Sequence, residues 1–107
     1  MRVLVLLALL WSGFSFGETS ELDEIRAKAE QGNKVAQFTL AWMYANGKGV
    51  PEDNVLAYMW INLAGANGAD VSKAKEILVQ EMSQADISKA QELTRQYIKD
   101  NPAVFPE

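Results

Sequence analysis

The 107-residue sequence contains neither cysteine nor histidine. Without histidine, a Ser-His-Asp or Cys-His catalytic arrangement and the common zinc sites are excluded. Without cysteine, no disulfide bond can form, although small exported proteins often depend on disulfides. The chain, which is long enough for one small domain, must therefore derive its stability from helix packing alone.

Basic residues are also few. Ten Lys and Arg stand against 14 Asp and Glu, which gives a formal net charge of −4. The basic residues are scattered among acids, as on an ordinary solvated surface, and form no stripe that could neutralise phosphates. This pattern excludes nucleic acid as the expected partner.

An apolar run opens the chain. Arg2 precedes the unbroken apolar stretch of residues 3–11, and small residues follow at Ser15 and Gly17. This order is typical of a signal peptide, and we expect residues 1–17 to be cleaved after Gly17. The alternative is an uncleaved anchor, although the stretch is shorter than the roughly 20 apolar residues of a membrane span.

Residues 36–68 have the pattern of a helical hairpin. The first helix carries four residues on one face: Ala36, Leu40, Met43 and Tyr44. Gly47 is expected to end this helix in the left-handed conformation, and Gly49 to allow the turn that follows. Val50 is expected to tuck between the helices and Asp53 to cap the second helix. The face of the second helix comprises Ala57, Trp60, Ile61, Ala64 and Gly68.

This stretch resembles one complete Sel1-like repeat. The positions that carry the resemblance are Ala36, Leu40, Met43, Tyr44, Gly47, Gly49, Val50, Asp53, Ala57, Trp60, Ala64 and Gly68. Ala41 and Gly65 depart from the family pattern, which usually has Gly and Ala there, but both are exchanges between small residues. The resemblance implies an all-α fold, a short α-solenoid of antiparallel helical hairpins related to the tetratricopeptide repeats.

The flanking segments are expected to cover both ends of this repeat, for a total of about five helices in residues 18–107. Residues 18–35 are predicted to form an N-terminal capping half repeat, with Ser20 as the helix cap. Residues 69–100 are predicted to form a degenerate C-terminal repeat, whose last helix Asp86 would cap, and residues 101–107 a short tail. The packed face of the last helix would comprise Ile87, Ala90, Leu93 and Tyr97.

Two short patterns could suggest chemistry. Ser72-x-x-Lys75 has the spacing of the β-lactamase nucleophile motif, but its partner motifs are absent, so a capping serine and a surface lysine are expected. Glu52 and Asp53 could form a cation site, but acids at a helix start are explained by the helix dipole. We therefore predict no enzyme activity, no metal site and no cofactor.

The aromatic residues at helical spacing are expected in the core: Phe38, Tyr44, Tyr58, Trp60 and Tyr97. Trp42 lies off that face, on a stripe with Val35, Thr39 and Asn46. The resemblance implies that first helices line a concave groove, so these four residues are the predicted partner-binding stripe. The alternative is that Trp42 packs against the N-terminal helix. Phe105 could dock into the groove or onto the last helix.

The leading functional hypothesis is a non-catalytic interaction module or adaptor in the bacterial periplasm, with a protein or peptide partner. One alternative is a protein that binds or modifies peptidoglycan, which would require a carboxylate pair that the spacing of the acids does not single out. A third hypothesis is a subunit that is stable only in a complex, including one formed by stacking on a second copy.

Overall fold

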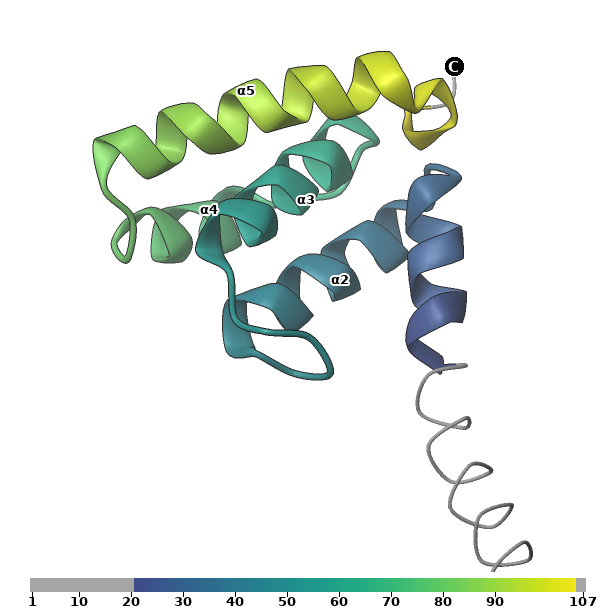
Figure 1. Ribbon diagram of the computed structural model, residues 1–107, viewed down its shortest axis with the longest axis horizontal. Coiled ribbons are helices and arrows are strands. Elements are labelled where there is room, and N and C mark those ends of the chain that lie inside the picture. Colours follow the sequence, from purple (N-terminus) through teal and green to yellow (C-terminus); the bar gives the residue numbers. More distant parts are fainter. Residues whose placement is uncertain (1–20, 106–107) are drawn as a thin grey trace, which may run out of the picture.

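The computed structural model describes residues 21–105, in which the regular elements are helices, as predicted. A helix over residues 21–30, here called the N-terminal helix, precedes the four helices labelled in Figure 1. These helices are α2 (Lys34–Asn46), α3 (Asn54–Ala66), α4 (Ser72–Val79) and α5 (Gln84–Asp100), and the 3-10 turn η1 (Pro102–Val104) follows. The predicted signal peptide, the predicted cap Ser20 and the last two residues lie outside the described residues.

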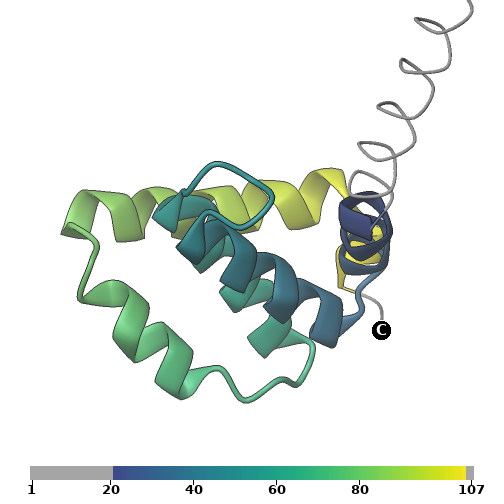
Figure 2. The same ribbon diagram turned by 90° about the horizontal axis from the view of Figure 1, so that it is seen from below.

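Helix α3 is the centre of the fold. Figure 1 shows it between α2 and α5, and the view in Figure 2 shows α4 on the side away from α5. The N-terminal helix lies beside the start of α2 and the end of α5 in both views. Because α3 has neighbours on several sides, most of its residues are buried: Ala57, Tyr58, Met59, Trp60, Ile61, Leu63 and Ala64.

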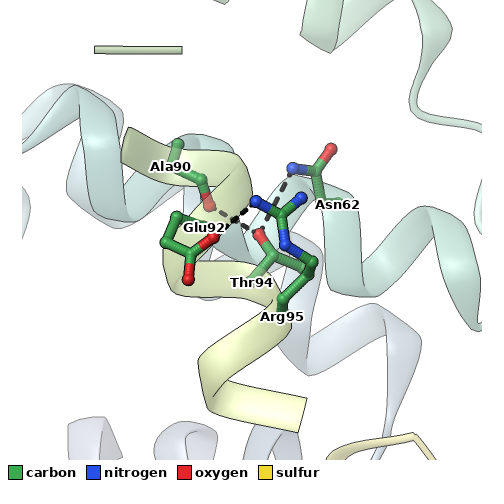
Figure 3. Close-up of polar contacts among 5 residues, drawn as sticks. All are labelled: Asn62, Ala90, Glu92, Thr94 and Arg95. Carbon is green, nitrogen blue, oxygen red and sulfur yellow. Dashed lines mark hydrogen bonds and ion pairs between the residues drawn. The ribbon is translucent and has the colours of Figure 1, made fainter. Parts of the chain in front are cut away.

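Aromatic packing and one polar contact join α3 to α5. The rings of Trp60 and Tyr97 meet edge to face, with centroids 5.1 Å apart. Partial burial raises the pKa of the Tyr97 phenol, and the Glu30 carboxylate adds to the rise. Asn62 Nδ2 donates to Thr94 Oγ1 over 3.3 Å, as Figure 3 shows. The Arg95–Glu92 pair in the same figure is exposed, so its contribution to stability is small.

The two-glycine turn has the predicted conformation. Gly47 and Gly49 have φ angles of 65° and 77°, in the left-handed region that a side chain disfavours. Val50 is buried. Asp53 caps α3, because its Oδ1 accepts from the backbone N–H of Leu56 over 3.0 Å. Its own N–H donates to the Tyr44 carbonyl, which fixes the start of α3 to the end of α2.

The predicted cap of the last helix was wrong by three residues. Ser83, not Asp86, is the N-cap of α5, and its hydroxyl accepts from the Asp86 N–H over 3.0 Å. The Asp86 carboxylate accepts in return from the Ser83 N–H, which completes a capping box. Serine and aspartate both occur as N-caps, and here the two reciprocal hydrogen bonds make Ser83 the N-cap and place Asp86 three residues later.

Gly65, one of the two departures from the family pattern, lies where α3 meets the segment leading to α4. A Cβ added at this position would lie 2.8 Å from Val71 Cγ2, which is closer than ordinary contact. The glycine therefore lets the chain pass close to α3 as it returns towards α4. The other departure, Ala41, is buried in the core.

A buried glutamine that the sequence analysis did not single out joins four parts of the fold. Gln37 in α2 is fully buried, and its Nε2 donates to the carbonyls of Ala29 and Val104, each over 2.9 Å. Its Oε1 accepts from Asn67 Nδ2 over 2.9 Å, and Asn67 Nδ2 also donates to the Val104 carbonyl. These four residues, here called the Gln37 network, connect the N-terminal helix, α2, the end of α3 and η1.

Replacing the second turn glycine tests the turn. The change Gly49→Val places a β-branched residue at positive φ, and its Cβ would lie 3.2 Å from Met43 Cε. We expect the free energy of unfolding to fall by about 1–3 kcal/mol in urea denaturation. Gly49→Asn is the control, with a smaller loss, because Asn tolerates this conformation. Equal stability of Gly49→Val and the wild type would contradict the turn geometry.

Replacing Gln37 tests the network. The change Gln37→Leu keeps the volume but removes three hydrogen bonds of a buried amide, so we expect a loss of about 2 kcal/mol in the free energy of unfolding. Gln91→Leu on the exposed surface of α5 is the matched control and should leave stability nearly unchanged. Similar denaturation midpoints for both variants would show that the network adds no stability.

Candidate partner-binding groove

An apolar groove of about 490 Å³ lies between α2 and α4, with α3 beneath it. Buried side chains of Ala41, Ile61 and Leu78 reach its floor. The small side chains of Ala45 and Ala74 leave the space between the two helices open. The volume lies within the range of roughly 300–1,000 Å³ that is usual for binding sites.

Large apolar side chains that line this groove remain exposed. The exposed fraction is 50% for Trp42 and 58% for Ile77, compared with 4% for Trp60 in the core. Phe38, expected in the core, is 36% exposed and also lines the groove, so that prediction was wrong. The buried residues of α2 are Ala36, Gln37, Leu40 and Ala41, and Met43 and Tyr44 are partly buried against the core. Apolar side chains gathered in one hollow are typical of interaction sites.

The predicted partner-binding stripe is divided among three hollows. Trp42 and Asn46 line the groove, whereas Thr39 and Trp42 border a second hollow that Leu22 and Ile25 of the N-terminal helix also line. Val35, which is 68% exposed, lines a third hollow with Thr39. Trp42 thus lies between the groove and the second hollow, and it fills neither of these two hollows completely. Its role in binding stays a prediction.

Two polar residues of the stripe satisfy their hydrogen bonds within α2. Thr39 Oγ1 donates to the Val35 carbonyl over 2.8 Å, and Asn46 Nδ2 donates to the Trp42 carbonyl over 2.9 Å. The groove therefore offers apolar surface more than free polar groups along α2. Phe105 is 44% exposed and is not among the residues that line the groove.

Sequence reasoning missed Phe38 and Ile77 as groove residues. Phe38 is one helical turn before Trp42, and this i, i+4 pair of aromatics was a usable signal for a shared face. Ile77 lies beside the packed position Leu78 on α4, so its exposure could be suspected from its place off that face. Which face of each helix is covered depends on the neighbouring helices, which the local pattern does not specify.

The two patterns that could suggest chemistry have structural explanations. Ser72 is the first residue of α4 and not its cap, and its Oγ donates to Asp70 Oδ1 over 2.7 Å. This hydrogen bond, with one from the Ser72 N–H, lowers the pKa of the exposed Asp70 carboxyl. Lys75 Nζ lies 5.5 Å from the centroid of the Tyr58 ring, in a cation–π contact.

Residues 21–105 contain no group of three or more acidic, His or Cys side chains that could hold a metal ion. No helix in the same residues is both long enough and apolar enough to cross a bilayer. Asp53, which follows Glu52 in the acidic pair, accepts the capping hydrogen bond of α3.

The two tryptophans of the described fold should differ in their effect on stability. Because Trp60 is buried and Trp42 is half exposed, Trp60→Ala should lower the free energy of unfolding by about 3–5 kcal/mol. Trp42→Ala should lower it by about 1 kcal/mol or less. Urea denaturation followed by circular dichroism measures both. A loss at Trp42 as large as that at Trp60 would place its side chain in the core.

A solved structure of a bacterial protein has a fold similar to that of this chain. No protein-family model matches the chain, and no curated protein matches it significantly. The chain is similar to the crystal structure of a protective antigen present in uropathogenic Escherichia coli strains, which displays an SLR fold. The TM-score is 0.70 and the sequence identity 29%, over 78% of this chain. The chain spans only 19% of the length of that antigen.

Proposed function

Because the chain has this Sel1-like repeat (SLR) fold, we propose that it is a non-catalytic protein–protein interaction module. The resemblance inferred from residues 36–68 is thus confirmed for the fold, and helical repeats of this kind are generally interaction modules. The observation that carries the proposal is the groove between α2 and α4, where Phe38, Trp42 and Ile77 are exposed above a buried floor.

The exposed apolar side chains of the groove favour a protein segment as the ligand. Each large apolar side chain gains about 25 cal/mol for every Å² of apolar surface removed from water, and aromatic residues in a hollow are frequent binding hot spots. Trp42 and Phe38 line the groove from one helix and Ile77 from the other, so an apolar side chain inserted between them would contact both helices. A partner side chain in this position would act as the anchor of the complex.

Export belongs to the same proposal and rests on the sequence of residues 1–17. A short basic start, an apolar run and small residues before Glu18 support a signal peptide and cleavage after Gly17. The module would then act in the bacterial periplasm as an adaptor. The mass of the protein purified from the producing cells would reveal whether those residues are removed.

Photo-crosslinking in the producing cells tests the interaction. A photoreactive residue in place of Trp42 lies in the groove, and one in place of Lys89 on the exposed surface of α5 is the matched control. We expect a discrete adduct with another protein at position 42 and none at position 89, identified by mass spectrometry. Adducts with glycan peptides would favour cell-wall binding instead. A folded variant without any adduct at position 42 would contradict the proposal.

A further inference from the structure

The groove between α2 and α4 carries charge of one sign only. Its charged lining residues are Glu52 and Glu81, and no Lys or Arg lines it. Both glutamates are exposed, and neither forms an ion pair with another residue of the described part of the chain. The second hollow differs, because both Glu21 and Lys48 line it. The groove therefore has two carboxylates available for a partner of opposite charge.

The two carboxylates lie at one end of the groove. Glu52 follows the C-terminal end of α2, and Glu81 follows the C-terminal end of α4. Figures 1 and 2 show that both helices end on the same side of the molecule, because each runs opposite to α3. The C-terminal end of a helix carries a partial negative charge, so the two helix ends add to the potential of the carboxylates.

Apart from Asn46 and Asn54, the other residues that line the groove are apolar. Phe38 and Trp42 line it along α2, and Ala74 and Ile77 line it along α4. The groove thus changes from an apolar region to an acidic end over the length of two short helices. A ligand that satisfies both regions needs apolar side chains and, at one end of them, a positive charge.

We propose that the groove binds a protein segment that has apolar side chains with Lys or Arg at one end of them. This inference rests on the proposed function and adds the chemistry of the partner. The apolar side chains would contact Phe38, Trp42 and Ile77, and the basic residue would approach Glu52 and Glu81. An amphipathic helix with apolar residues at i and i+3 or i+4 has this form and is a common occupant of helical grooves.

The test is a selection from a displayed library of random short peptides. The purified wild-type protein and the double variant Glu52→Lys/Glu81→Lys serve as separate baits, and circular dichroism verifies that both are folded. We expect the wild type to enrich apolar peptides with Lys or Arg on one side, and the double variant to enrich Asp or Glu there. Glu76→Lys is the matched control, because Glu76 is exposed on α4 but does not line the groove.

A peptide selected by the wild type then gives the size of the effect. We expect the double variant to bind it about tenfold more weakly, since two exposed attractions become repulsions, and Glu76→Lys to bind it nearly as the wild type does. Higher salt should reduce the wild-type affinity and not that of the double variant. Calorimetry measures all three proteins with the same peptide.

The outcomes separate this inference from the proposed function. Adducts at position 42 with a protein segment that lacks basic residues would overturn the inference and leave the interaction module in place. The inference would also be overturned, with the interaction module left in place, if the enriched peptides show no charge preference or if reversal of both glutamates leaves the affinity unchanged. An adduct with a second copy of the chain would have the same consequence. Failure of both the crosslinking and the selection would overturn both proposals.

Discussion

Apolar contacts with the buried helix α3 hold the other helices of this fold in place. No disulfide or metal-binding cysteine or histidine is available to this chain, so apolar contact around one central helix must hold the other elements. Helices α2 and α4 both pack on α3, which places them on either side of Ile61. The alanines between them are too small to close the space. The groove is therefore a direct consequence of how the core is built.

Much of the fold could be predicted from local signals. The left-handed glycines of the turn, the cap at Asp53 and the apolar period of α3 each depend on a few adjacent residues, and the structure has them as expected. The groove was less accessible to sequence reasoning. Phe38 and Leu40 are both apolar residues of one helix, yet only Leu40 is covered, because burial depends on which side of α2 faces α3. Trp42, which its spacing places off the Ala36–Leu40 face, is half exposed.

Two further features differ from what the sequence predicts or suggests. The cap of α5 depends on competition between two capping residues, and the Gln37 network depends on contacts between residues far apart in the chain. Ser83 and Asp86 are both good capping residues, and only the reciprocal hydrogen bonds of the capping box decide between them. Gln37 looks like a surface residue in a helical pattern. Its partners include the Val104 carbonyl, 67 residues further along the chain, and no local period reveals a backbone acceptor at that separation.

The Gln37 network also affects how the fold unfolds. In repeat proteins each unit contacts only its neighbours, so terminal units can fray while the middle stays folded. Here one amide side chain bonds both the end of the N-terminal helix and the turn after α5, which closes the described chain into a ring of non-covalent links. If either the N-terminal helix or η1 detaches, the Gln37 amide that also bonds the other element loses a buried hydrogen bond. This short solenoid should therefore lose its structure in a single cooperative step.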